Sequence, residues 1–265
     1  MIARKTWHEV RGMGLAYLLI LELMLVPAIL LYPELRRAGS ALVEIMPADF
    51  LKKMMQQVFD PDSGTAFRAY MAVQMFFKGV NIVGIAAAVL MGTGIVARER
   101  ENQTLEFLLA RPVSRSRILW GKFWPIALVV VVPVFLTSWT AIPISALEPV
   151  NEELPFAAVT ICSLHNAAFC VLILAITTLC SVLARAQVHA AFWVGALVIL
   201  QVALYFIQKI RIVSLFRLSD FEVYGPIMAG NDGFQSVFFG MTIWVLLATA
   251  VVYLIADRLF RRVTL

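Results

Sequence analysis

The stretch GMGLAYLLILELMLVPAILLY, from Gly12 to Tyr32, decides the fold class. It is almost wholly apolar and about 20 residues long, which is the length that a helix needs to cross the hydrocarbon core of a bilayer. Only helices and closed barrels satisfy their backbone hydrogen bonds there, and a continuous apolar run favours a helix. Similar blocks follow at Tyr70 to Ala97, Phe123 to Leu147, Pro155 to Leu183, Ala190 to Gln208 and Gln235 to Ala256. The sequence therefore predicts an all-α integral membrane protein with six transmembrane helices.

The composition of the chain supports this class. Of its 265 residues, 61% are hydrophobic and 15% are charged, whereas a soluble domain has a smaller apolar share and a larger charged one. The formal net charge of +5 is explained by basic residues at the ends of membrane helices, so no nucleic-acid partner is expected. Cys162, Cys170 and Cys180 lie in one apolar block without CxxC spacing, which argues against disulfides and against a metal site.

The remaining segments complete one transmembrane domain over residues 1–265. The first block is too long for the core of a signal peptide, and no convincing cleavage site follows it. Residues 1–11 mix charges with Trp7, which predicts a short N-terminal interfacial helix. The longest polar segment covers residues 33–69. Apolar residues recur in it at helical spacing, which predicts an amphipathic helix on the membrane surface; they are Phe50, Leu51, Met54, Met55 and Val58.

The distribution of Lys and Arg predicts the orientation. One set of segments carries Arg4, Lys5, Arg11, Arg98, Arg100, Arg111, Arg115, Arg117, Lys122, Arg185, Arg258, Arg261 and Arg262. The opposite set holds fewer basic residues, and acidic residues offset them: Arg36, Arg37, Lys52, Lys53, Arg68, Lys209, Arg211 and Arg217. By the positive-inside rule, both termini and the loop 98–122 are expected in the cytoplasm, and the segment 33–69 outside it. Six spans agree with this arrangement because their number is even.

The segment ARERENQTLEFLLARPVSRSRILWGKF, from Ala97 to Phe123, differs from an ordinary connecting loop. It contains a run, Thr104 to Ala110, that predicts a short helix. Asn102 or Thr104 can cap its start, and the residue before Pro112 is disfavoured in helical geometry, which ends it. A second helix then leads into the next span.

The short helix has an apolar face. Leu105, Leu108 and Leu109 share that face by their spacing, and Phe107 widens it. Ser114 or Ser116 can cap the helix that follows. Two interpretations of the exposed apolar face remain open. The helix lies flat on the inner membrane surface, or it fits a groove on a soluble partner and transmits motion to the spans.

The segment resembles the corresponding loop in permease subunits of type-2 ABC exporters. Members of this family commonly carry E-R/K-E, then T-L-E-x-L-L, then P-V-S-R, then G-K before the next span. The chain shows Glu99-Arg100-Glu101, Thr104-Leu105-Glu106-Phe107-Leu108-Leu109, Pro112-Val113-Ser114-Arg115 and Gly121-Lys122. It departs from the pattern at Asn102-Gln103, where a glycine is frequent before the threonine. The resemblance is specific in residues over this loop, and in layout it extends over nearly the whole chain.

The resemblance implies a coupling helix between the second and third spans that docks on a separate P-loop ATPase subunit. The residues in contact with that subunit would be Arg100, Glu101, Asn102, Thr104, Leu105, Glu106, Leu108 and Leu109. It implies a non-catalytic permease subunit without cofactors, whose partner binds ATP and Mg. The chain has no GxxxxGK[S/T] motif of its own. A second copy or a homologous permease would complete the exporter, in a bacterial or archaeal cytoplasmic membrane.

Four polar residues lie at similar depth within three of the predicted spans: Glu22, Lys78, Asn81 and His165. Because ionisable groups inside membranes are costly, such residues are candidates for a translocation path, with an ion pair between Glu22 and Lys78. The alternative is that Lys78 extends to the membrane surface and that Asn81 and His165 form hydrogen bonds between packed helices.

Three other classes of function agree less well with the sequence. A stand-alone carrier or channel would need coupling residues in broken helices or inverted repeats, and the sequence shows neither. A membrane anchor that recruits a soluble protein shares the short helix, but it predicts no polar residues inside the spans. An intramembrane enzyme lacks support because neither HExxH nor GxSxG occurs.

Overall fold

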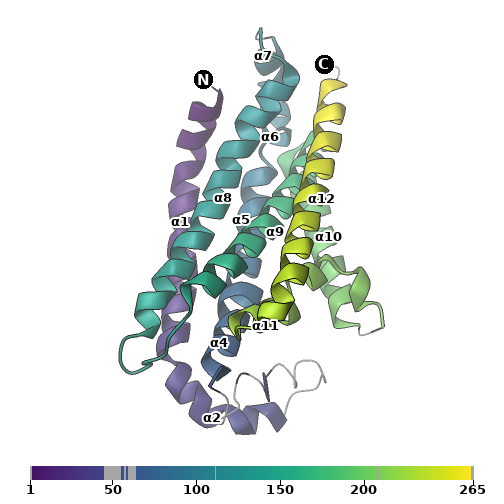
Figure 1. Cartoon of the computed structure of the whole chain (residues 1–265). Coiled ribbons are helices and arrows are strands. Elements are labelled where there is room, and N and C mark those ends of the chain that lie inside the picture. The colour runs from purple at the N-terminus through teal and green to yellow at the C-terminus, as the bar shows by residue number, and fades with distance from the viewer. Residues whose placement is uncertain are drawn as a thin grey trace.

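The computed structural model describes residues 2–44, 55, 56, 58, 64–110, 112–207 and 209–263. In this part of the chain every regular element is a helix, and six helices are long and apolar enough to cross a membrane, which confirms the predicted fold class. Figure 1 shows them side by side, with both termini and the short helix α7 at one end of the bundle. We call this the α7 end, and we call the opposite end, where the helix labelled α2 lies, the α2 end.

The first span is α1 (Ile2–Leu30), which is followed by α2 (Tyr32–Glu44). The second consists of α4 (Ala66–Met71), the π-helix η1 (Ala72–Val80) and α5 (Asn81–Gly92), and it continues into α6 (Ala97–Glu101). The short helix α7 (Leu105–Leu109) comes next. The remaining spans are α8 (Arg115–Ser145), α9 (Phe156–Leu183), α10 (Gln187–Phe206) and α12 (Gln235–Arg261).

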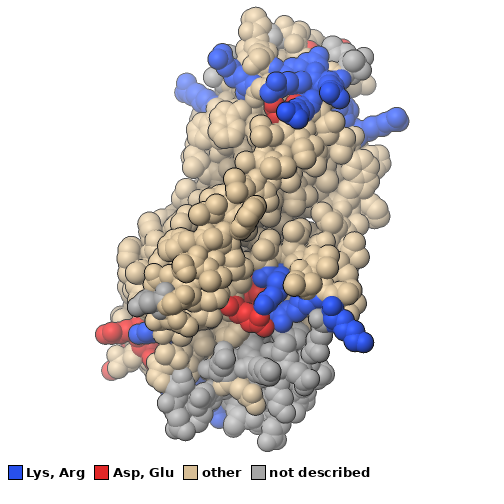
Figure 2. Space-filling view, turned by 45° about the vertical axis from the view of Figure 1, so that its right-hand side comes forward, with Lys and Arg blue, Asp and Glu red and all other residues tan. Residues whose placement is uncertain are grey.

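Each of the six predicted spans overlaps one of these helices, and α1, α8 and α12 extend beyond the predicted spans at the α7 end. The helices α1, α8 and α12 each continue through a charged turn that the apolar blocks exclude. Hydropathy marks the part of a helix that hydrocarbon covers, whereas backbone hydrogen bonding continues until a residue breaks it. In keeping with this, Figure 2 shows Lys and Arg gathered at the α7 end and a broad middle band on this face without charged residues.

The predicted N-terminal interfacial helix does not form a separate element. The helix α1 runs unbroken from Ile2 to Leu30, and its only proline is Pro27. Nothing between Arg11 and Gly12 interrupts it, and Thr6 and Val10 are buried, so these first turns continue the span along α8. The predicted amphipathic helix around residues 50–58 lies outside the described residues, apart from Met55, Gln56 and Val58.

The helix α9 lies at the centre of the bundle. It packs against α12, α8, α5 and α10, and it buries the largest share of its residues among the six spans. By contrast, α1, α10 and α12 bury few residues and expose large apolar side chains such as Leu23, Phe192 and Trp244. Exposed apolar faces of this size are stable where hydrocarbon surrounds them.

The connection between α10 and α12 folds back against the bundle. It contains the short helices η2 (Arg211–Val213), η3 (Leu215–Ser219), α11 (Phe221–Met228) and η4 (Asp232–Phe234), and α11 packs on η1 and α9. Asp220, which is 1% exposed, begins α11. It accepts hydrogen bonds from Phe221 N at 2.6 Å and Tyr205 OH at 2.7 Å. It also pairs with Arg211 and with Arg217 at 2.8 Å.

Candidate functional site

The end of α6 is a Schellman motif, a turn that closes a helix with two backbone hydrogen bonds. Thr104 N donates to Glu99 O at 2.9 Å, and Gln103 N donates to Arg100 O at 3.1 Å. Gln103, the first residue after the end of the helix and its cap, adopts a left-handed conformation with a φ of 56°, as the motif requires. This is the position at which glycine is frequent in the resembling loops. The turn therefore ends α6 before α7 begins at Leu105.

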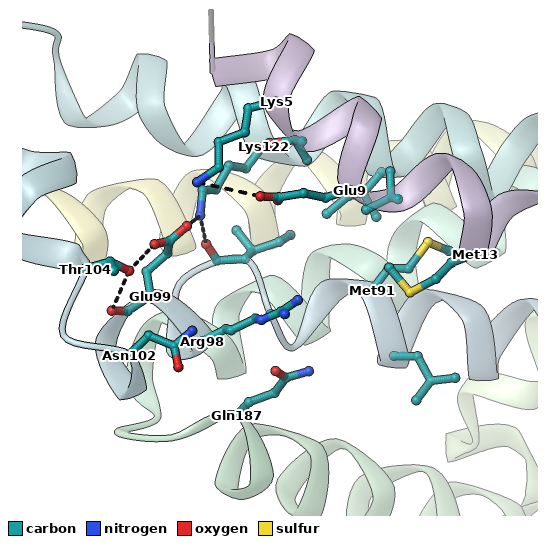
Figure 3. Close-up of a pocket in the computed structure, with 16 residues that line it drawn as sticks. Lys5, Glu9, Met13, Met91, Arg98, Glu99, Asn102, Thr104, Lys122 and Gln187 are labelled. Atoms are coloured by element: carbon teal, nitrogen blue, oxygen red, sulfur yellow. Dashed lines mark hydrogen bonds and ion pairs between the residues drawn. The ribbon is translucent and has the colours of Figure 1, made fainter.

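A lysine from α8 holds this turn. The ammonium group of Lys122 donates to Glu99 Oε1 at 2.6 Å and to Ile95 O at 3.0 Å. The Thr104 hydroxyl bonds to the other carboxylate oxygen of Glu99. Figure 3 shows Lys122, Glu99 and Thr104 pointing toward one another. Because Lys122 is only 8% exposed, its charge needs this partner, and the pair fixes the segment from the end of the second span to the start of α7.

The helix α6 is also attached to the turn between α9 and α10. Arg100 donates to Val182 O at 3.2 Å and to Ala184 O, at the end of α9 where carbonyls lack partners within the helix. The Glu101 carboxylate accepts from Gln187 N at 3.0 Å, at the start of α10 where negative charge is favoured. Arg100 and Glu101, both predicted to contact an ATPase, therefore bind the neighbouring spans.

Ser181 of α9 completes the attachment. Its Oγ accepts hydrogen bonds from Val96 N and Ala97 N, both at 3.0 Å, and donates to Thr93 O at 2.7 Å. These backbone groups belong to the break between α5 and α6, where helical hydrogen bonding is interrupted. Sequence reasoning missed Ser181, because a serine in an apolar block resembles any small residue used in helix packing.

The orientation of α7 corrects one prediction. Leu105 is 5% exposed, and Leu108 and Leu109 pack against the bundle core, so the apolar face that was predicted to be exposed is turned inward. Phe107, on the opposite side, is 77% exposed. The spacing identified a common face, but a spacing pattern does not say whether a face meets the rest of the chain or a partner.

The ends of the two helices in this segment follow the prediction more closely. The helix α7 ends at Leu109, before Pro112, as predicted. Thr104 occupies the position before its first turn, but its hydroxyl bonds to Glu99 and not to the backbone of α7. Ser114 caps α8 by accepting from Arg117 N at 3.4 Å, which confirms the predicted cap.

The polar residues predicted to line a path separate into two groups. Glu22 accepts a hydrogen bond from Thr140 Oγ1 of α8 at 2.8 Å, and Lys78 is exposed on η1. Among the described residues no ion pair joins them, so the predicted pairing is wrong. Depth along each helix was estimated from the sequence, but the direction in which each side chain points around its helix was not.

Asn81 belongs to a buried polar cluster, which we define as Asn81, Asn166, Ser219 and Tyr224. Asn81 Nδ2 donates to Ser219 O at 2.8 Å, and its Oδ1 accepts from Asn166 Nδ2 at 2.9 Å and from Ser219 Oγ at 2.8 Å. Asn166 Nδ2 also lies 2.9 Å from Tyr224 OH. The cluster ties α5, α9 and the segment that folds back between α10 and α12.

His165 lies beside this cluster and is fully buried. Its Nε2 lies 2.6 Å from Leu218 O, and its Nδ1 lies 2.8 Å from Thr242 Oγ1. Because a carbonyl only accepts, a neutral ring carries its proton on Nε2. Nδ1 then faces the Thr242 hydroxyl, which also donates to Phe238 O at 3.0 Å. The arrangement of Asn81 and His165 agrees with the alternative in which polar groups join packed helices.

Within the described ranges, no group of three or more His, Cys, Asp or Glu side chains is placed to hold a metal ion. Cys162 and Cys170 are buried free thiols, and Cys180 is a half-buried one.

Comparison with known proteins identifies a family. A family model described as "ABC-2 family transporter protein" matches residues 7–263, which is nearly the whole chain. The match therefore includes all six spans and the segment from α6 to α8. No curated protein matches the chain.

Proposed function

The chain belongs to the ABC-2 family of transporter proteins, and from this membership we propose that it is the membrane-spanning permease subunit of an ABC exporter. ATP hydrolysis takes place in a separate P-loop ATPase subunit, which binds ATP and Mg, and this chain has no catalytic role. A second copy or a homologous permease completes the transport unit. The membrane is the cytoplasmic membrane of a bacterium or archaeon.

The observation that carries the proposal is the attachment of the α6–α7 segment to three spans. Lys122 joins it to α8, Ser181 joins it to α9, and Glu101 joins it to the start of α10. A load applied to α7 therefore reaches several membrane helices through hydrogen bonds and one ion pair. A segment that merely connects two spans, or a simple anchor for a soluble protein, has no need of these contacts.

The contact with the ATPase is proposed on the exposed side of α7 and its preceding turn. Phe107 is 77% exposed, and Asn102, Gln103 and Glu106 are also exposed. An aromatic side chain surrounded by polar groups is a frequent centre of binding energy at protein interfaces. The buried Leu105 acts from the inner side by holding α7 on the bundle.

Co-purification with soluble P-loop ATPases from the same host tests this contact. Phe107→Asp is expected to abolish co-purification, whereas Phe107→Leu retains it because an apolar group still fills the partner's groove. Leu105→Asp is expected to lower the melting temperature, since it places a charge in the core, whereas Phe107→Asp leaves it unchanged. Undiminished binding of an ATPase by Phe107→Asp would overturn the assignment.

The orientation is part of the proposal. Lys and Arg gather at the α7 end (Figure 2), where Arg98 lies in α6, Arg117 in the first turn of α8, and Arg258 and Arg262 at the end of α12. A concentration of basic residues favours the cytoplasmic side. Labelling of intact cells with a membrane-impermeant maleimide tests it, in a variant whose three cysteines are replaced by alanine. Gln103→Cys at the α7 end is expected to stay unlabelled, and Glu153→Cys in the loop between α8 and α9 is expected to react. The reverse pattern would contradict the orientation.

A further inference from the structure

A pocket opens at the α7 end beside the segment described above. Its volume is about 270 Å³, and its walls come from α1, the α5–α7 region, α8 and the first residue of α10. Figure 3 shows the polar side chains on one side of the space and the methionines Met13 and Met91 on the other. The Glu99–Lys122 pair also lines the pocket, whereas Phe107 does not, so the pocket is distinct from the exposed side of α7.

The pocket is lined by three basic and two acidic side chains, so one cation has no acidic partner among them. Lys5 pairs with Glu9 at 3.6 Å, and Lys122 pairs with Glu99 at 2.6 Å. Arg98 also lines the pocket, and it forms no ion pair with any carboxylate in the part of the chain that the structure describes. The pocket therefore presents an unneutralised guanidinium, a group that binds phosphate oxygens through two parallel hydrogen bonds.

A second donor lies beside Arg98. The Gln187 side-chain amide lines the pocket from the start of α10, where it lies 3.3 Å from Thr93 Oγ1. Gly94 lies between these two side chains. A Cβ at this position would lie 3.7 Å from Arg98 Cδ and 3.8 Å from Gln187 Nε2. A longer side chain at Gly94 would fill the space that both donors face.

The opposite wall is apolar and continues onto the outer surface of the bundle. Met13 is 41% exposed and Leu90 is 68% exposed, and both line the pocket. The volume lies just below the range of about 300–1,000 Å³ that holds whole small molecules. It accommodates a lipid headgroup, whereas acyl chains would have to lie outside, along Met13 and Leu90.

We propose that this pocket binds the phosphate headgroup of an anionic membrane phospholipid, with Arg98 and Gln187 on the phosphate and an acyl chain against Met13 and Leu90. An anionic headgroup suits the unpaired charge of Arg98, whereas a choline headgroup would bring a further cation. The site goes beyond the proposed permease function, because it requires neither an ATPase nor a transported substrate.

Thermal unfolding of the full chain in an uncharged detergent tests the proposal. Dioctanoyl phosphatidylglycerol is titrated in one arm, dioctanoyl phosphatidylcholine in a second and inorganic phosphate in a third. We expect a saturable rise in melting temperature with phosphatidylglycerol only. Equal protection by phosphatidylcholine would overturn the anionic specificity. Equal protection by phosphate alone would overturn the lipid as ligand, because the apolar wall would then contribute nothing.

Variants connect the effect to the pocket. Arg98→Gln is expected to weaken phosphatidylglycerol binding at least tenfold, since it removes the charge-assisted hydrogen bonds. Arg117→Gln removes an exposed cation at the same end but outside the pocket, and it should bind as the wild type does. Gly94→Leu fills the space without changing the charge and should also lose binding. Wild-type affinity in both Arg98→Gln and Gly94→Leu would overturn the site.

Discussion

Lys122 of α8 lies 2.6 Å from Glu99 of α6, and the same ammonium group lies 3.0 Å from Ile95 O. The pair joins two spans at the place where the chain leaves the second span and turns into α7. Both side chains are largely buried, at 10% and 18% exposed. This contact is therefore one of those that hold the α6–α7 segment on the bundle, and the only one of them that is an ion pair among the described residues.

We predict that Lys122→Met destabilises the chain by about 3 kcal/mol, because it leaves the Glu99 carboxylate without its counter-charge. The double variant Lys122→Met/Glu99→Met should lose less than the sum of the single losses. Thermal unfolding in detergent measures both. Lys5→Met is the control, since Lys5 and Glu9 form an exposed pair that contributes only about 0–1 kcal/mol. Equal losses in Lys122→Met and Lys5→Met would contradict the role of burial.

A glycine in place of Gln103, the left-handed residue of the turn after α6, is expected to stabilise the chain. Gln103 has a φ of 56°, a conformation that costs a side-chain-bearing residue roughly 1–2 kcal/mol and that glycine adopts freely. Gln103→Gly should therefore raise the stability by about 1 kcal/mol. Asn102→Gly is the matched control, because Asn102 has a φ of −81° and glycine there only adds freedom to the unfolded chain. A lower melting temperature for Gln103→Gly would refute the argument.

We expect replacement of Asp220, in the segment between α10 and α12, to lower the stability of the chain strongly. It accepts two hydrogen bonds and pairs with Arg211 and Arg217 while 1% exposed. Burial lowers the pKa of Arg211, but Asp220, Tyr205 and Glu222 together raise it by more, so the pKa of Arg211 is raised. Asp220→Ala should lower the free energy of unfolding by about 3–5 kcal/mol, since it removes the buried partner of both arginines. Glu222→Ala, which removes a half-exposed partner of the same arginines, should cost less than about 1 kcal/mol.

The spans and the cap at Ser114 could be predicted from the sequence because each depends on residues that are close together along the chain. Hydropathy sums over a block of about 20 residues, and a capping serine acts within one turn. Accordingly, α9 (Phe156–Leu183) agrees with its predicted block to within one residue at both ends, and α7 ends before Pro112.

The contacts that organise the site depend on residues far apart in the chain. Ser181 and Ala97 meet only after α9 packs against α5, and neither carries a local pattern that indicates the other. The same reason accounts for Glu22, which bonds to Thr140 and not to Lys78. Helical spacing identifies residues that share a face, but packing between helices decides what that face meets.

Ser181 allows the sharpest separation of a tertiary contact from a local one. Ser181→Ala leaves Val96 N, Ala97 N and Thr93 O without their partner, and each stranded buried group costs about 1–3 kcal/mol. We expect Ser181→Ala to lower the free energy of unfolding in detergent by at least about 3 kcal/mol. Ser163→Ala is the control on the same helix. Ser163 is equally buried, but its hydrogen bond is to Val159 O, one turn away. Ser163→Ala should therefore lower the free energy of unfolding by less than about 1 kcal/mol. Ser181 also joins α9 to the start of α6. If the chain acts with an ATPase as proposed, Ser181→Ala should therefore lower the ATP hydrolysis that the permease stimulates in its partner by more than Ser163→Ala does. Equal effects of the two substitutions on stability and on stimulated hydrolysis would show that the break in the second span does not depend on α9.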